Sequence, residues 1–186
     1  MVLLRLRVAV VGEPTSGKTA FVQMVHSNGA TFPKNYLMTM GCDFVVKEFT
    51  IDEDNTVEVS FMDVAGQRLY DPMTSYYLEN VSAFILVYDV SNKITFESCR
   101  KWVAKARGAK KDMIGFLVAN KMDLAEKAEV TDNQAEVFAR ANQLTFFKCS
   151  ALRGTGILEP VEKLAHTFLE AYQKRIAQVS QLNASR

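Results

Sequence analysis

The sequence predicts an α/β fold in which a mostly parallel β-sheet carries helices on both faces. Three observations support this prediction. Strand-like and helix-like segments alternate along the chain, as parallel strands with crossover helices require. Residues 83–90 are apolar apart from Asp89, as expected for a strand that is covered on both faces. The polar residues 52–55 separate two strand-like stretches and predict one hairpin, and hence one antiparallel edge strand.

The amino-terminal half begins with a strand, a loop and a helix. Residues 3–11 form an apolar run that predicts the strand, and residues 18–27 carry apolar side chains at helical spacing. Residues 44–51 and 56–62 then form the two strands of the predicted hairpin.

The remaining segments continue the alternation. Thr131 and Gln134 form a capping box, which predicts that a helix begins at that point. The predicted elements are a helix around residues 96–106, a strand at 114–119, a helix at 131–142, a strand at 145–149 and a helix at 161–176.

Composition limits the possible classes of protein. A chain of 186 residues with 48% hydrophobic and 23% charged residues suits a single soluble globular domain. The net charge of +1 gives no general attraction to nucleic acid or anionic lipid, so neither is expected as a partner. Cys42, Cys99 and Cys149 match no metal-ligand spacing and predict reduced thiols in the cytoplasm. The basic residues between 101 and 111 are expected on a solvated helix face and loop.

The loop between the first strand and the first helix carries the most specific motif. It fits the pattern G-x-x-x-x-G-K-[ST], whose backbone N–H groups point at a phosphate. Lys18 would supply positive charge to the outer phosphates, and the Thr19 hydroxyl could ligate Mg²⁺. The helix N-terminus also favours an anion. The expected phosphate-binding residues are Gly12, Glu13, Pro14, Thr15, Ser16, Gly17, Lys18, Thr19 and Ala20.

A second motif follows the strand at residues 56–62. Ligands of open α/β sheets bind beyond the carboxyl ends of the strands. Asp63 is therefore placed to hold Mg²⁺ or a water molecule bound to it, although a carboxylate after a strand can also be a turn residue. Gly66 can bring a backbone N–H to a terminal phosphate, and Gln67 could orient an attacking water molecule.

A third group of residues follows the last two strands. A carboxylate such as Asp123 can accept two N–H bonds from the Watson–Crick edge of guanine, a pattern that adenine does not offer. Adenine would leave that carboxylate unpaired, which is a large penalty. Alone, such a carboxylate is more often a helix cap or a solvated charge. The residues of this group are Asn120, Lys121, Asp123, Ser150, Ala151 and Leu152.

Together these motifs resemble those of the Ras-superfamily small GTPases, in the same order and spacing, over about residues 5–175. The segments that resemble the Rab branch are residues 39–44, 76–77 and 86–90. The resemblance implies a P-loop NTPase fold with a six-stranded sheet and five helices. It also implies binding of GTP and GDP with Mg²⁺, and effector and regulator proteins that bind the switch regions.

The resemblance implies roles around the phosphates. The Thr39 hydroxyl would bind Mg²⁺ and its N–H the γ-phosphate, and Tyr36 would close over the phosphates. The implied catalytic residues are Gln67, Lys18 and Thr39, and the implied metal ligands are Thr19, Thr39 and Asp63.

The resemblance also implies a base pocket. Phe32 would pack edge-on against guanine, although an isolated phenylalanine is more often part of the core. Asn120 and Lys121 would brace the pocket, Asp123 would read the guanine edge, and the Ala151 N–H would meet the base carbonyl.

Several positions depart from the family pattern. Pro14 and Thr15 stand where small GTPases often carry glycines, and their side chains crowd the space between Gln67 and the γ-phosphate. Leu152 replaces a lysine and weakens one wall of the base pocket. No cysteine follows Cys149, so prenylation and a direct lipid anchor are not expected.

An unprenylated chain with a short tail is similar to the Rab-like GTPases of the intraflagellar transport B complex. This resemblance implies transport-complex subunits and a constitutive small β-sandwich protein as partners, and a location in the cytoplasm and in a cilium or flagellum. Residues 1–178 would form the GTPase domain and residues 179–186 a short polar tail.

Three functions remain open. The chain is a GTP-regulated switch with slow intrinsic hydrolysis, a guanine-nucleotide-binding assembly module whose hydrolysis is dispensable, or a phosphotransferase of the nucleotide-kinase type. The motifs at residues 63–67 and 120–123 disfavour the third function, because a nucleotide kinase would share only the phosphate loop.

Overall fold

Six strands form one sheet in the order β2-β3-β1-β4-β5-β6 in the computed structural model, which describes residues 2–35 and 37–184. Strand β2 pairs with β3 in antiparallel fashion, and every other neighbouring pair is parallel, which confirms the predicted sheet and its antiparallel edge strand. The strands are β1 Val2–Val11, β2 Cys42–Thr50, β3 Asn55–Val64, β4 Ala83–Asp89, β5 Ile114–Asn120 and β6 Leu144–Lys148.

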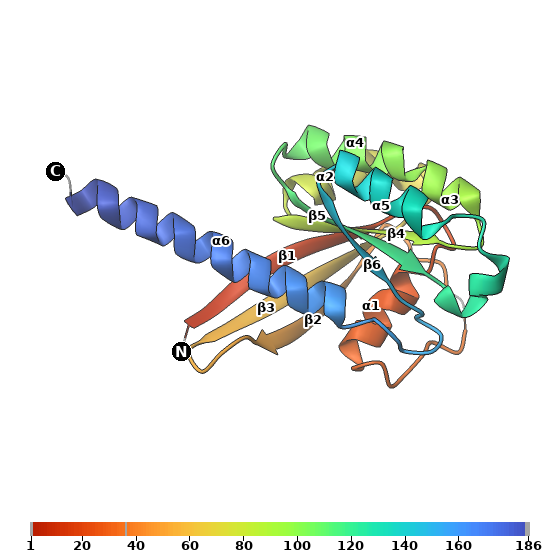
Figure 1. Ribbon diagram of the computed structural model, residues 1–186, viewed down its shortest axis with the longest axis horizontal. Helices are drawn as coiled ribbons and strands as arrows, with labels where there is room; N and C mark the ends of the chain where they lie inside the picture. The colour runs from red at the N-terminus through yellow and green to blue at the C-terminus, as the bar shows by residue number, and fades with distance from the viewer. Residues whose placement is uncertain (1, 36, 185–186) are drawn as a thin grey trace.

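Helices cover both faces of this sheet (Figure 1). Helices α1 and α6 lie on one face, and α2, α3, α4 and α5 lie on the other. The α-helices are α1 Lys18–His26, α2 Asp71–Glu79, α3 Lys93–Glu97, α4 Cys99–Ala109, α5 Asp132–Ala141 and α6 Glu159–Ala184; short 3-10 helices cover Arg68–Tyr70 (η1) and Met122–Lys127 (η2).

Three helices differ from the sequence prediction. The helix predicted around residues 96–106 is two helices, α3 and α4, which meet at Ser98. The sequence prediction did not include helix α2, which buries only Thr74 and Leu78 and therefore has no strong apolar pattern. Helix α6 continues beyond residue 176 to Ala184 and extends past the sheet in Figure 1. No helix among the described residues is long and apolar enough to cross a membrane.

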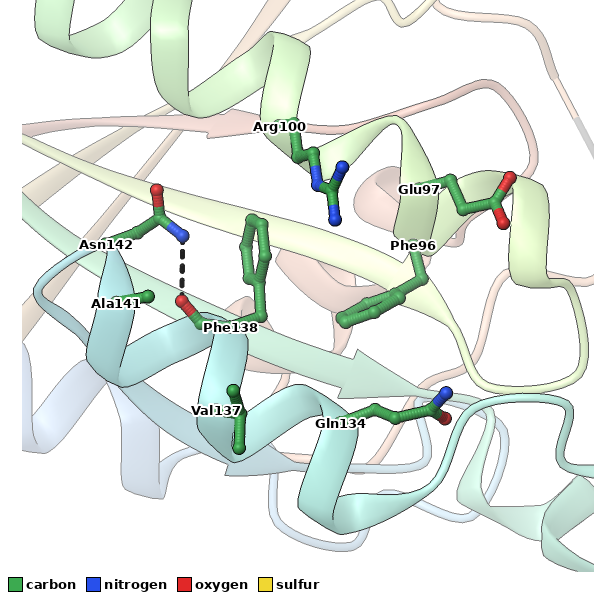
Figure 2. Close-up of a pocket in the computed structure, with 8 residues that line it drawn as sticks. All are labelled: Phe96, Glu97, Arg100, Gln134, Val137, Phe138, Ala141 and Asn142. Carbon is green, nitrogen blue, oxygen red and sulfur yellow. Dashed lines mark hydrogen bonds between the residues drawn. The ribbon is translucent and has the colours of Figure 1, made fainter.

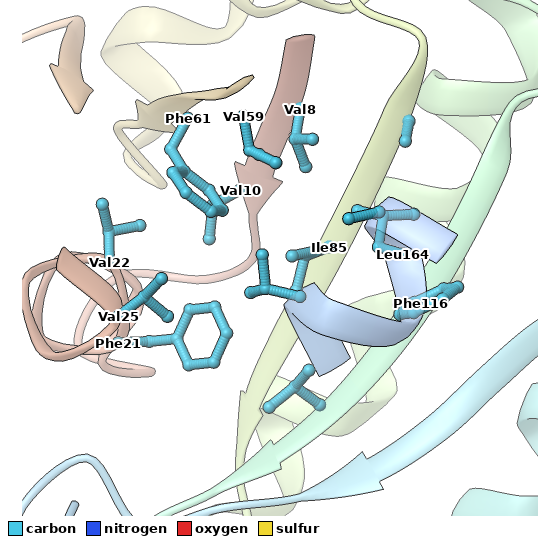
Figure 3. Packing of buried hydrophobic residues seen from close by; sticks show 14 of the residues in the cluster. Val8, Val10, Phe21, Val22, Val25, Val59, Phe61, Ile85, Phe116 and Leu164 are labelled. Atoms are coloured by element: carbon cyan, nitrogen blue, oxygen red, sulfur yellow. The ribbon is translucent and has the colours of Figure 1, made fainter. Parts of the chain in front are cut away.

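Two hydrophobic clusters form the core, one on each face of the sheet. Strand β1 contributes to both in alternation: Val8 and Val10 face α1 and α6, and Ala9 and Val11 face the opposite helices. Figure 3 shows the first cluster, with Phe21 of α1 beside strand side chains. Full burial of one large apolar side chain contributes about 1.5–3 kcal/mol, so the clusters fix the strands in register.

Candidate functional site

The phosphate loop between β1 and α1 requires glycine at two positions. Gly12 has φ 146°, and a Cβ atom there would lie 2.2 Å from the carbonyl oxygen of Val87. Gly17 has φ 91°, and its Cβ would lie 2.3 Å from Nδ2 of Asn120. The loop is thus pressed against β4 and the end of β5, and it leads directly into the N-terminus of α1.

Lys18 occupies the first turn of α1 with only 6% of its surface exposed. Its Nζ donates a hydrogen bond to the carbonyl oxygen of Glu13, 2.9 Å away, so the ammonium group lies over the phosphate loop. Burial lowers the Lys18 pKa to about 8, against the opposing attraction of the Asp63 and Glu13 carboxylates. A buried ammonium group of this kind gains from an anion, because a phosphate replaces the solvation that the charge has lost.

Thr19, Thr39 and Asp63 converge beside this lysine from three separate segments. The Thr19 hydroxyl donates to Oδ2 of Asp63 at 2.6 Å, and the two threonine hydroxyls lie 3.0 Å apart. The Thr39 hydroxyl donates to the same carboxylate oxygen at 3.3 Å. Burial is the main cause that raises the pKa of Asp63, and the two hydroxyl donors oppose it.

This oxygen cluster fits Mg²⁺. The other carboxylate oxygen of Asp63, Oδ1, is buried and has no hydrogen-bond partner in the described structure. A buried lone carboxylate oxygen is costly unless a cation or a water molecule approaches it. Mg²⁺ prefers hard oxygen ligands and is usually held by one or two carboxylates together with substrate phosphates.

Gly66 and Gln67 follow β3 and differ in their relation to the loop. A Cβ atom on Gly66 would lie 2.4 Å from the Gly12 carbonyl oxygen and 2.7 Å from the Pro14 nitrogen, so Gly66 packs directly on the phosphate loop. The Gln67 side-chain amide instead contacts the Met38 sulfur. The role of Gln67 in orienting water therefore stays a prediction.

Asn120 joins three loops at the carboxyl edge of the sheet. Its side chain is 1% exposed, and its Nδ2 donates to the Ser16 carbonyl oxygen at 3.0 Å. Its Oδ1 accepts the backbone N–H of Ala151 at 3.1 Å. The Asp123 carboxylate accepts a hydrogen bond from the Ser150 hydroxyl. Asn120, Asp123, Ser150 and Ala151 therefore lie together, although the contacts of Asp123 and Ala151 with a base stay predictions.

Asp89 is a residue that the sequence reasoning missed. It ends β4 opposite Asn120, and its Oδ2 lies 2.6 Å from Nζ of Lys121. Lys121 itself has φ 65°, a left-handed backbone that a lysine rarely adopts. This ion pair therefore holds the Lys121 side chain at the same edge of the sheet. The available signal was position, since Asp89 is the charged residue that ends an otherwise apolar strand.

Four further predicted site residues lie at the surface, against the core or outside the described structure. Phe32 is 38% exposed and Leu152 is 58% exposed, so both can be reached from solvent. Ala20, in the first turn of α1, packs against the core. Tyr36 lies outside the described residues, and its role stays a prediction.

The expectation that the basic residues between 101 and 111 are solvated holds for Lys110 and Lys111, which are exposed, but not for Lys101, Lys105 and Arg107, which are partly buried. Lys101 and Lys105 both pair with Asp71 of α2. Arg107 donates to backbone carbonyl groups, among them those of Met113 and Asn142. These side chains join α4 to its neighbours, a use that helical spacing alone does not reveal.

A groove of about 700 Å³ lies away from the phosphate loop, between α5 and the two helices α3 and α4 (Figure 2). Its lining residues are Phe96, Glu97, Arg100, Gln134, Val137, Phe138, Ala141 and Asn142. None of the predicted site residues lines it, so it is a separate feature of the surface.

Comparisons with known proteins agree with this geometry. The family model "Ras family" matches residues 7–170. An intraflagellar transport protein 27 homolog of Trypanosoma brucei brucei is 60% identical over 182 residues, covering 98% of this chain and 100% of the relative. The mouse homolog of the same name is 38% identical over 179 residues, with 95% and 96% covered. Ras-related protein Rab-11C of Dictyostelium discoideum is 30% identical over 159 residues, with 85% and 70% covered.

The resemblance predicted from the motifs is therefore confirmed. Ras-family proteins are in general GTPases that bind guanine nucleotide with Mg²⁺. The chain belongs to the Ras family, and within it to the Rab-like small GTPases that include the intraflagellar transport protein 27 homologues.

Proposed function

We propose that the chain binds GTP and GDP with Mg²⁺ and acts as a nucleotide-dependent switch in intraflagellar transport, with slow intrinsic GTP hydrolysis. The observation that carries this proposal is the convergence of three groups at one edge of the sheet. They are the phosphate loop with Lys18, the oxygen cluster of Thr19, Thr39 and Asp63, and the polar cluster around Asn120. Residues 1–178 would form the nucleotide-binding domain, and residues 179–186 its tail.

Binding would use groups that are already held in place. The loop N–H groups and the Lys18 ammonium would cradle the phosphates, and Asp123 would accept the N–H groups of guanine. Thr19, Thr39 and the Asp63 carboxylate would hold Mg²⁺, and the ion would neutralise negative charge on the phosphate oxygens. The Ala151 N–H would turn from Asn120 toward the base carbonyl or share its hydrogen with both.

Switching would use Thr39 and Gly66. Thr39 lies in a segment without regular secondary structure, and Gly66 packs on the phosphate loop. A γ-phosphate that accepts hydrogen bonds from the backbone N–H groups of both residues would order the segments that contain Thr39 and Gly66, which effectors and regulators would then bind. Loss of the γ-phosphate would release the two segments.

Hydrolysis would be slow because Gln67 is not directed at the loop. Its amide contacts Met38, and Pro14 lies in the phosphate loop against Gly66, the residue before Gln67. The same observation favours a second candidate, a GTP-binding assembly subunit whose hydrolysis is dispensable.

The relatives suggest partners and a location. The names of the trypanosome and mouse proteins place those proteins in intraflagellar transport. We extend this to the present chain, with transport-complex subunits and a constitutive small β-sandwich protein as partners, no nucleic-acid partner, and a cytoplasmic and ciliary or flagellar location.

Nucleotide competition tests the binding proposal. A fluorescent GDP analogue should be displaced by GTP and GDP but not by ATP, because ATP leaves the Asp123 carboxylate unpaired. Thr19→Asn should weaken Mg²⁺-dependent GTP binding, with Thr167→Asn at a half-buried position of α6 as the matched control. Equal displacement by ATP would contradict the guanine assignment.

Single-turnover hydrolysis separates the two candidate functions. The wild type should hydrolyse bound [γ-³²P]GTP slowly, and Gln67→Leu more slowly still, because it removes the amide that would have to leave Met38 to orient water. Identical rates for the two proteins would favour the assembly subunit. A pull-down from ciliated cells would then compare the partners of the GTP-loaded and GDP-loaded forms.

A further inference from the structure

A series of side-chain contacts joins the phosphate loop to the start of α2, the helix that follows Gln67. Trp102 of α4 is completely buried, and its indole Nε1 donates to Oε1 of Glu13 at 3.2 Å. A buried indole N–H needs an acceptor. The Glu13 carboxylate is this acceptor, and the contact therefore anchors the phosphate loop to α4.

Two lysines of α4 continue the series from Trp102 to α2. The ammonium groups of Lys101 and Lys105 lie 5.7 Å and 5.0 Å from the centre of the Trp102 ring, within the range of cation–π attraction. The same groups lie 3.3 Å and 2.8 Å from the two carboxylate oxygens of Asp71, the first residue of α2. The hydrogen bond from Lys105 is the main cause that lowers the pKa of Asp71, so the carboxylate stays charged at neutral pH.

Both ends of this series lie in the nucleotide site. At one end, the backbone oxygen of Glu13 accepts the hydrogen bond from Lys18. At the other end, the backbone oxygen of Gln67 accepts the N–H of Tyr70 at 3.0 Å, and Tyr70 immediately precedes Asp71. A shift of α2 relative to α4 would therefore move the Gln67 backbone, and a shift of the phosphate loop would move the acceptor of the indole.

We propose that Trp102 is a positioning residue that couples the phosphate loop to the segment carrying Gln67. The contacts among Glu13, Trp102, Lys101, Lys105 and Asp71 form what we name the Trp102 link. Nucleotide binding moves or stiffens the loop. The displacement of Glu13 shifts Trp102, and the two lysines transmit this shift to the N-terminus of α2. The link rests on the proposed GTPase function for its consequence, but its contacts can be tested without nucleotide.

The sequence offers a direct probe, because Trp102 is the only tryptophan in the chain. Its intrinsic fluorescence reports the Glu13 carboxylate and the lysines around the ring. Asp71→Asn removes the charge that holds both lysines while keeping the size of the side chain. Glu136→Gln is the matched control, because it removes one carboxylate from an exposed i,i+4 pair with Arg140 of α5.

Two fluorescence results are expected. In the nucleotide-free protein, Asp71→Asn should change the intensity or wavelength of Trp102 emission, and Glu136→Gln should leave both unchanged. In the wild type, exchange of GDP for the slowly hydrolysed analogue GTPγS should change the emission, and Asp71→Asn should reduce this change by half or more. Emission of Asp71→Asn equal to that of the wild type in the nucleotide-free protein would overturn the link, whether or not nucleotide binds.

Hydrolysis gives the functional measurement. Asp71→Asn should lower the single-turnover rate by about three- to tenfold, which lies within the range of about two- to thirtyfold that contact networks carry, while GDP and GTPγS affinities stay within about twofold of wild type. If Asp71→Asn lowered nucleotide affinity by the same factor as the hydrolysis rate, the contacts would have a general structural role, and this would contradict a positioning role for Trp102. If Gln67→Leu hydrolyses at the wild-type rate, Gln67 does not orient water, the proposed switch with Gln67-assisted hydrolysis fails, and the two fluorescence results decide the link alone.

Discussion

Replacing Asn120 with alanine should destabilise the protein more than its small change in size suggests. The Asn120 side chain donates to the Ser16 carbonyl oxygen at 3.0 Å and accepts the Ala151 N–H at 3.1 Å, both in buried surroundings. Alanine leaves that carbonyl and that N–H without a partner. An unsatisfied buried polar group costs about 1–3 kcal/mol, so the two together cost roughly 2–6 kcal/mol. This is a large part of the roughly 5–15 kcal/mol that stabilises a typical domain.

Urea denaturation followed by far-UV circular dichroism measures this loss as a change in midpoint at constant m-value. Because about 1 kcal/mol shifts the Tm of a domain of this size by about 2–4 °C, a fall of at least about 4 °C is expected. Asn80→Ala is the matched control, since Asn80 is exposed and its Nδ2 donates to the Tyr76 carbonyl oxygen at 2.8 Å. That variant should stay within about 0.5 kcal/mol of wild type. A loss below about 1 kcal/mol for Asn120→Ala, or one equal to that of Asn80→Ala, would refute the assigned buried roles.

Three other predictions concern a helix cap, a buried leucine and a buried lysine. Thr131→Ala removes the side chain that accepts the Gln134 N–H at the start of α5, and it should lower stability by about 1 kcal/mol in urea titration. Leu78 is one of two buried residues of α2, so Leu78→Ala should cost about 2–5 kcal/mol and speed amide exchange across Asp71–Glu79; unchanged exchange there would contradict this anchoring. The Lys18 pKa is about 8 in the folded protein and 10.5 in the unfolded chain, so between these values the unfolded state binds more protons and stability rises with pH. In the nucleotide-free protein, Lys18→Met should be more stable than wild type near pH 7, and this advantage should shrink between pH 8 and pH 10.5.

The parts of the fold that depend on local patterns were predictable from the sequence. The continuous apolar run of β4 and the Thr131 capping box both appear where expected, because each is set by neighbouring residues. The meeting of the motifs at one sheet edge was predictable for a general reason. Parallel strands bring their carboxyl ends together, so Asp63 and Asn120 had to approach the phosphate loop.

Contacts between distant segments could not be predicted in this way. Glu13 and Trp102 are 89 positions apart, and each has an ordinary local explanation, as a loop residue and as a core side chain. The orientation of Gln67 toward Met38 depends on a loop with no periodic pattern at all.

The register of β1 against β3, fixed by the alternating side chains of β1, sets the positions of groups in the nucleotide site. Val10 lies opposite Asp63 in the neighbouring strand, so the spacing between the phosphate loop and the metal-binding carboxylate is counted from that pair. A slip of one residue would move the loop by about 3.3 Å along the sheet and would also turn Val8 and Val10 toward the wrong helices. Such a slip is strongly unfavourable, because the β1 side chains of the two hydrophobic clusters would exchange faces of the sheet. Aliphatic side chains in the middle of the sheet therefore set the distances between the polar groups at its edge. Substitutions of these side chains should weaken nucleotide binding although they change no polar group.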